Sequence, residues 1–273
     1  MQPGHLPTID WRYWLAILIA SVCGTNLGDL GSQTMGLGFV SALLPFAAAF
    51  AFLFRVQRRA GRARELCYWL MIIVCRAAAT NIADLATHEL KVAYSLTACA
   101  LVVLLVTILA VGAALGQTTV RSTRLGDGPW QNVPDANPTY WAAILTASVF
   151  GTATGDFIAD DCWLGVGPAA LVLTVLTAML VLVSLRDGPE IKPLYWLTIV
   201  AVRIAGTNIG DFLAGEDGLN VGIPAASVAS CAVLACVVFL RKDGRRMPVL
   251  HAARGRSPAS EPAPQARRLF GLL

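Results

Sequence analysis

Four aspartates recur at one position of a repeated motif, and a carboxylate held at one depth of several membrane helices is a candidate for solute or proton binding. Each aspartate lies 15 residues after the tryptophan of a Tyr-Trp pair and ends a six-residue pattern that begins Gly-Thr-Asn or a close variant. The tryptophans are Trp14, Trp69, Trp141 and Trp196, and the aspartates are Asp29, Asp84, Asp156 and Asp211. The chain therefore carries four tandem copies of one unit.

The same pattern supplies further oxygen atoms beside each carboxylate. These belong to Thr25, Thr80, Thr152, Thr207, Asn26, Asn81 and Asn208, and the third copy has Ala153 at the asparagine position. Carboxylate, amide and hydroxyl oxygens suit hard cations such as magnesium, manganese or calcium better than zinc or copper. The sequence thus predicts a cation-binding site with the four aspartates as candidate metal ligands.

Two arginines occupy the motif seven residues after the tryptophan. Copies two and four have Arg76 and Arg203 there, whereas copies one and three have Ser21 and Ser148. Each arginine is either the partner of an aspartate in a structural ion pair or a gating residue, and the sequence leaves both readings open. With four aspartates and two arginines ionised, the motif helices keep a formal charge of −2, which suits one divalent cation or coupling protons.

The composition places these motifs in a membrane. The chain is 56% hydrophobic and only 14% charged, with a mean hydropathy of +0.63, whereas soluble domains carry about a quarter charged residues. Eight apolar segments of about 20 residues, the length that spans a bilayer, cover 11–30, 36–55, 66–86, 92–115, 139–158, 164–185, 194–214 and 219–240. The first contains a complete motif, so we interpret it as a retained helix and not as a cleaved signal.

The spacing of the copies indicates a two-level duplication. Copies one and two are 55 residues apart, as are copies three and four, and the two pairs are offset by 127 residues. We predict a first half at 1–115, a cytoplasmic linker at 116–138, a second half at 139–241 and a disordered tail at 242–273. Because each unit holds two membrane segments, all four motif helices enter the membrane in the same direction, as parallel helical-hairpin repeats do.

Helical geometry predicts which helices lie inside. The motif residues share one face of a helix, and its small residues let backbones approach closely in lipid. The glycines at these packing positions are Gly24, Gly28, Gly151, Gly155, Gly206 and Gly210. We therefore expect an all-α fold with an inner ring of four motif helices and an outer ring of four plain, lipid-facing helices. Glycines this close together also weaken a helix, so the motif is a candidate for a local break that bares backbone carbonyls.

Four tandem units, each with two membrane segments and a tryptophan near its start, resemble a bacterial membrane family known only as a repeat of unknown function. The resemblance covers about residues 11–241. It implies a multi-pass protein of the bacterial inner membrane and brings no activity with it.

The charge distribution predicts orientation and narrows the function. Of the 21 lysines and arginines, 18 lie in the N-terminus, the even-to-odd loops and the tail, which places both termini in the cytoplasm. Topology accounts for this basic excess, so we expect no nucleic-acid partner.

Catalysis is poorly supported by the remaining residue types. His5, His88 and His251 lie in predicted loops or tails, which disfavours haem ligation and histidine-based catalysis. The seven cysteines show no Cys-x-x-Cys spacing. We expect a transporter of a small solute, with a cation as the expected cargo, and no enzyme. The alternative is a non-transporting protein whose aspartates and arginines stabilise the helix bundle or dock a partner. The sequence determines neither a cofactor nor the oligomeric state.

The first prediction concerns topology. Reporter fusions after Gly116 and at the C-terminus should both report a cytoplasmic location, because the basic residues gather on that side. An external signal from either fusion would contradict both the orientation and the parallel arrangement of the repeats.

Overall fold

Eight helices form most of the molecule. The computed structural model describes residues 6–59, 64–124, 130–187 and 192–244, and within them eight helices are long and apolar enough to cross a membrane. They are α1 (Trp11–Asp29), α2 (Gly38–Arg59), α3 (Arg64–Asp84), α4 (Tyr94–Ala114), α5 (Pro138–Asp156), α6 (Val166–Asp187), α7 (Lys192–Ala214) and α8 (Ile223–Gly244). The predicted all-α membrane fold is confirmed. Met1–Val237 form one compact unit and Val238–Leu273 another.

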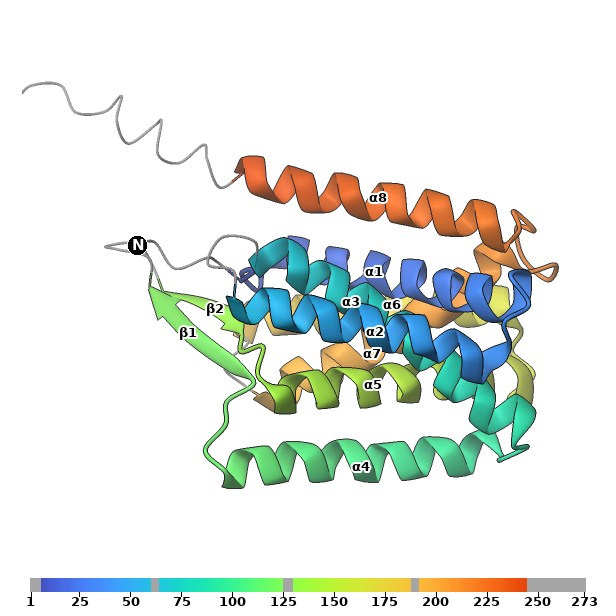
Figure 1. The fold of residues 1–273 in the computed structure, drawn as a ribbon, viewed down its shortest axis with the longest axis horizontal. Coiled ribbons are helices and arrows are strands. Elements are labelled where there is room, and N and C mark those ends of the chain that lie inside the picture. Colours follow the sequence, from blue (N-terminus) through green and yellow to red (C-terminus); the bar gives the residue numbers. More distant parts are fainter. Residues whose placement is uncertain (1–5, 60–63, 125–129, 188–191, 245–273) are drawn as a thin grey trace, which may run out of the picture. The chain divides into compact units, whose positions relative to one another are not determined.

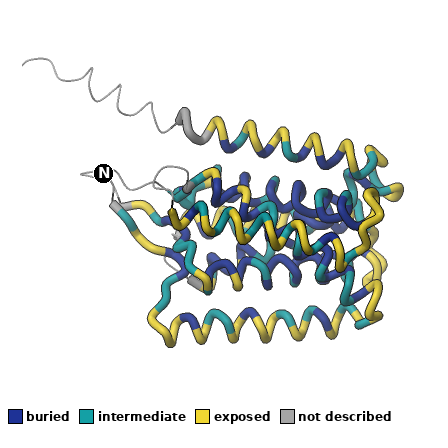
Figure 2. Tube along the Cα trace, viewed as in Figure 1, coloured by how far each residue is buried: buried dark blue, intermediate teal, exposed yellow. Residues whose placement is uncertain are grey.

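The four motif helices form a closed inner ring. Helix α1 packs against α3, α3 against α5, α5 against α7, and α7 against α1. Their side chains make up most of the buried core, whereas α2, α4, α6 and α8 expose most of theirs (Figures 1 and 2). The two sequence halves are joined within this ring, since α3 of the first half contacts α5 of the second.

Three plain helices pack on the motif helix of the following repeat. Helix α2 lies against α3, α4 against α5, and α6 against α7. On α8, Cys231 lies beside Cys23 of α1. The outer helices therefore link successive repeats around the ring.

The motif helices are continuous through their glycines, so the local break expected there is not observed. Instead, a wider π-helical turn begins directly after the aspartate in three repeats: η1 (Leu30–Thr34), η2 (Leu85–Glu89) and η3 (Phe157–Asp161). Short π-helical segments are frequent at functional sites. In the fourth repeat α7 continues to Ala214.

The linker at 116–138 holds structure that the sequence analysis missed. Strands β1 (Val120–Arg124) and β2 (Trp130–Pro134) pair antiparallel. The backbone N–H of Ile9 donates to the Asn132 carbonyl at 2.8 Å, and Trp196 Nε1 donates to Thr119 Oγ1 at 3.2 Å. These bonds hold the hairpin against the end of the bundle at which α1 begins. Of the tail predicted at 242–273, residues up to Gly244 continue α8, and the rest lies outside the described residues.

Close helix contacts explain the small residues of the motif. A methyl group on Gly24 would overlap Cβ of Arg76, and one on Gly151 would overlap Cβ of Arg203. A second layer repeats the pattern, since a methyl on Gly28 would lie 2.9 Å from Thr80 Cβ. Further contacts of the same kind join Gly155 to Thr207, Gly206 to Ser21 and Gly210 to Thr25. The glycines of α1, α5 and α7 thus leave room for side chains of the next motif helix around the ring.

The second prediction tests these close helix contacts. Gly24→Ala and Gly151→Ala should each lower the free energy of unfolding by about 1–3 kcal/mol, because the added methyl overpacks the helix contact. Thermal unfolding of the purified protein in detergent measures the change. Gly31→Ala is the matched control, because its methyl would meet Ala42 and Phe46 at ordinary distances of 3.7 Å. Equal stability of all three variants would contradict the packing described.

Candidate functional site

Polar side chains meet on the axis of the inner ring in successive layers. From the end at which α1 begins, the register of the motif places a tyrosine layer first, then the two arginines, the threonines and the aspartates. Each layer takes its residues from all four helices, except that the arginines come only from α3 and α7.

The tyrosine hydroxyls form a closed ring of hydrogen bonds. The O···O distances are 2.9 Å for Tyr13 and Tyr68, 2.7 Å for Tyr68 and Tyr140, 3.1 Å for Tyr140 and Tyr195, and 2.8 Å for Tyr195 and Tyr13. All four side chains are fully buried. The ring closes the axis at this end. From the sequence these tyrosines were not predicted to form a site, although their fixed position directly before each tryptophan could have indicated a shared layer.

Arg76 ties three other helices together. Its guanidinium donates to the Ser148 carbonyl oxygen at 2.8 Å, to Thr152 Oγ1 at 2.6 Å, to Thr25 Oγ1 at 2.8 Å and to Thr207 Oγ1. The side chain is fully buried. These acceptors belong to α5, α1 and α7, so Arg76 closes the axis above the tyrosine ring with hydroxyl and carbonyl oxygens, not with a carboxylate.

Arg203 has a different environment. It is fully buried, and within the described part of the chain no acceptor lies in hydrogen-bonding range of Nε, Nη1 or Nη2. Its electrostatic neighbours include Tyr13, Tyr68, Tyr140 and Cys75. The two arginines that the sequence treats alike therefore differ, because one bonds to threonines and the other lies near the tyrosine ring.

The aspartates and threonines line one cavity of about 430 Å³ on the far side of Arg76. All four carboxylates and all four threonines are in its wall: Asp29, Asp84, Asp156, Asp211, Thr25, Thr80, Thr152 and Thr207. The threonines are almost fully buried, whereas Asp156 and Asp211 are half-buried. The structure thus brings together eight of the eleven residues that the sequence singled out for ion binding, with the threonines innermost.

Three residues at the outer rim of this cavity are not among the ion-binding residues predicted from the sequence. Gln33, His88 and Asp160 line it and are exposed, and Gln33 Nε2 donates to Asp29 Oδ1 at 3.1 Å. Each lies four residues after a motif aspartate, one helical turn further along. This spacing indicates that the three residues continue the face of the motif helices that carries the aspartates. Because the helices were expected to end earlier, His88 was placed in a loop. It lies in η2 instead.

The asparagines lie outside the cavity wall. Nδ2 of Asn26, Asn81 and Asn208 donates to the carbonyl four residues earlier, and Asn81 Nδ2 also donates to the Gly28 carbonyl at 3.2 Å. They serve contacts between adjacent motif helices. Among the described residues, no three histidine, cysteine, aspartate or glutamate side chains are grouped closely enough to hold a metal ion. The cavity therefore suits a hydrated cation or protons better than a metal held directly by all four aspartates.

A family described as "Repeat of Unknown Function (DUF347)" matches the chain three times, over residues 12–63, 139–188 and 194–243. These ranges make up more than half of the chain. The chain belongs to this family. Each range covers most of one DUF347 unit, a motif helix with the plain helix that follows it, and the copy around Trp69 lies between the matched ranges as a fourth unit of the ring. No curated protein and no solved structure matches the chain.

The third prediction separates the two arginines. Arg76→Met should lower the thermal unfolding temperature, because hydrogen bonds to a charged group contribute about 1.5–3 kcal/mol each. Arg203→Met should leave it unchanged or raise it, because replacing a buried cation that lacks a partner with an apolar side chain removes a desolvation cost. Thermal unfolding of the purified variants measures both. Equal destabilisation by the two substitutions would contradict the different environments.

Proposed function

We propose that this protein is a transporter of a small cation, with the cavity between the four aspartates as its entry site. We place it in the bacterial inner membrane with both termini in the cytoplasm, so the cavity faces outward. We do not expect it to catalyse a chemical reaction. Hard divalent metals and protons are the cargo that its oxygen-rich wall suits best.

One observation carries this proposal: four carboxylates from four different helices line a single cavity. Ionisable groups within membrane helices are costly, and they mark ion pathways or proton relays when they face the interior of a bundle. Asp160 adds a fifth carboxylate at the rim. Together they create a negative potential that attracts cations to the cavity.

The path beyond the cavity is closed by two barriers. Arg76 bonds to three threonines below the aspartates, and the tyrosine ring seals the axis further along. A cation bound in the cavity would repel Arg76 and favour its release from the threonines. We therefore infer that transport proceeds by alternating access, with Arg76 as the charged gate and the tyrosine ring as the second closure.

The second candidate function is a non-transporting protein. The hydrogen bonds of Arg76 to α1, α5 and α7 favour it, because a side chain that joins three helices stabilises the bundle whether or not anything moves along the axis. In that case the aspartates only complement the positive charge of the arginines.

The fourth prediction decides between these functions. Asp29→Asn and Asp156→Asn should each reduce cation uptake at least about tenfold, the ratio that corresponds to about 1.4 kcal/mol, because amides keep the size of the side chain and remove its charge. The cargo is first identified by the total ion content of cells with and without the gene. Uptake is then measured in liposomes with indicators for magnesium, manganese, calcium and protons.

Asp217→Asn is the matched control, because Asp217 is an exposed acid after α7 that does not line the cavity. It should keep full uptake. Loss of thermal stability in Asp29→Asn and Asp156→Asn, with uptake per folded protein unchanged, would favour the structural function.

A further inference from the structure

Two cavities on the outer surface of the ring meet at the end of the bundle at which α1 begins. One is polar, has a volume of about 380 Å³, and lies between the end of α2, β1 and the start of α5. The other is an apolar groove of about 550 Å³ between α2, α3 and α5. Phe54 and Pro138 line both. The polar cavity and the apolar groove therefore adjoin each other at Phe54 and Pro138.

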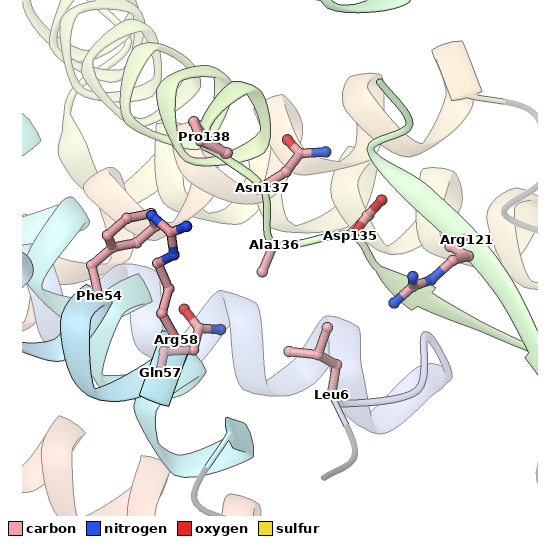
Figure 3. A pocket seen from close by; sticks show the side chains of 9 residues that line it. All are labelled: Leu6, Phe54, Gln57, Arg58, Arg121, Asp135, Ala136, Asn137 and Pro138. Atoms are coloured by element: carbon pink, nitrogen blue, oxygen red, sulfur yellow. The ribbon is translucent and has the colours of Figure 1, made fainter. Parts of the chain in front are cut away.

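The polar cavity carries a net positive charge. Arg58 and Arg121 lie on opposite sides of it (Figure 3), and both are exposed. Asp135 also lines the cavity, but its carboxylate accepts a hydrogen bond from Thr118 at 2.8 Å. Arg58 lies over the Phe54 ring with 5.9 Å between its guanidinium carbon and the ring centroid. Because two arginines line the cavity with one carboxylate that already accepts a hydrogen bond, the cavity favours the binding of an anionic group.

The apolar groove has the dimensions of a lipid chain. It follows α2 from Phe54 to Leu43, a rise of about 16 Å at 1.5 Å per residue. One leaflet contributes about half of the ~30 Å hydrocarbon core. Its lining includes Phe50 and Trp141, whose rings are 5.7 Å apart and in edge-to-face contact with each other, and small residues such as Ala78. A single acyl chain fits its length and its chemistry.

From these two spaces we propose that the α2–α3–α5 groove binds an anionic phospholipid. Its phosphate lies between Arg58 and Arg121, and one acyl chain lies along the groove. Basic pockets between membrane helices at the cytoplasmic face are suited to anionic head groups, and the end of α2 is the basic end of the bundle. This site is separate from the aspartate cavity and does not depend on the transport function.

The groove also joins elements that belong to different repeats. Helix α2 belongs to the first repeat, α3 to the second and α5 to the third. A lipid seated there contacts all three, so it should stabilise the folded bundle by binding it in preference to the unfolded chain.

The fifth prediction tests this lipid site on the full-length protein purified in detergent. Native mass spectrometry should show tighter binding of phosphatidylglycerol than of phosphatidylcholine with identical acyl chains. Arg58→Gln and Arg121→Gln should each weaken phosphatidylglycerol binding about fivefold, the ratio equivalent to the ~1 kcal/mol that one basic residue contributes at an anionic lipid surface.

Arg55→Gln is the matched charge control, because Arg55 lies near the same end of α2 but lines a different surface with Arg59. It should bind phosphatidylglycerol as the unaltered protein does. For the chain site, Ala47→Phe should fill the groove and weaken binding of both lipids, whereas Ala48→Phe, outside the groove lining, should not. Equal binding of the two lipids, equal losses for Arg55→Gln and Arg58→Gln, or no effect of Ala47→Phe would overturn the proposal.

Discussion

The close approach of the four motif helices is the constraint on which the other features depend. Gly24 and Gly151 leave room for the first carbons of Arg76 and Arg203, and the second layer of glycines receives the threonines. With the backbones this close, the axis is narrow enough for four tyrosine hydroxyls to bond to one another and for Arg76 to reach three helices at once. Larger side chains at the glycine positions would separate the helices and break both the tyrosine ring and the hydrogen bonds of Arg76.

The same geometry makes the axis asymmetric. At one end the tyrosine hydroxyls form a closed ring, and at the other the π-helical turns after three of the aspartates contribute residues to the wall of the cavity. The charge follows this asymmetry, because the carboxylates line the cavity at one end, with Asp29 and Asp84 buried and Asp156 and Asp211 half-buried, and the arginines lie fully buried in the closed part. The two ends of the four-repeat bundle therefore differ in opening and in charge, although all four repeats point the same way.

The sequence predicted the fold well because its strongest signals, apolar length and a repeated register, are local. It placed the eight helices, the inner ring and the shared cavity of the four aspartates. It could not separate Arg76 from Arg203, since both occupy the same motif position and only the surrounding helices decide which acceptors each can reach. It misplaced His88 because the predicted segment ended at residue 86, and the π-helical turn from Leu85 to Glu89 leaves no strong compositional mark. The asparagines were assigned to ion binding from their chemistry alone, whereas their amides serve helix contacts.

The offset packing of the outer helices bears on how the chain is synthesised. Because α2 lies on α3 and α6 lies on α7, the plain helix of a newly inserted repeat has no motif helix to cover until the next repeat is inserted. The first motif helix has no predecessor, and the helix that lies beside it, through Cys231 and Cys23, is the last one made. The ring itself closes only when α7, the last motif helix, has been inserted and packs against α1. Until then the nascent protein is an incomplete ring in which the first and the last inserted motif helix each lack a neighbour. A ribosome-associated insertase would have to shield these two helix faces from lipid, and a second incomplete ring could pack against them.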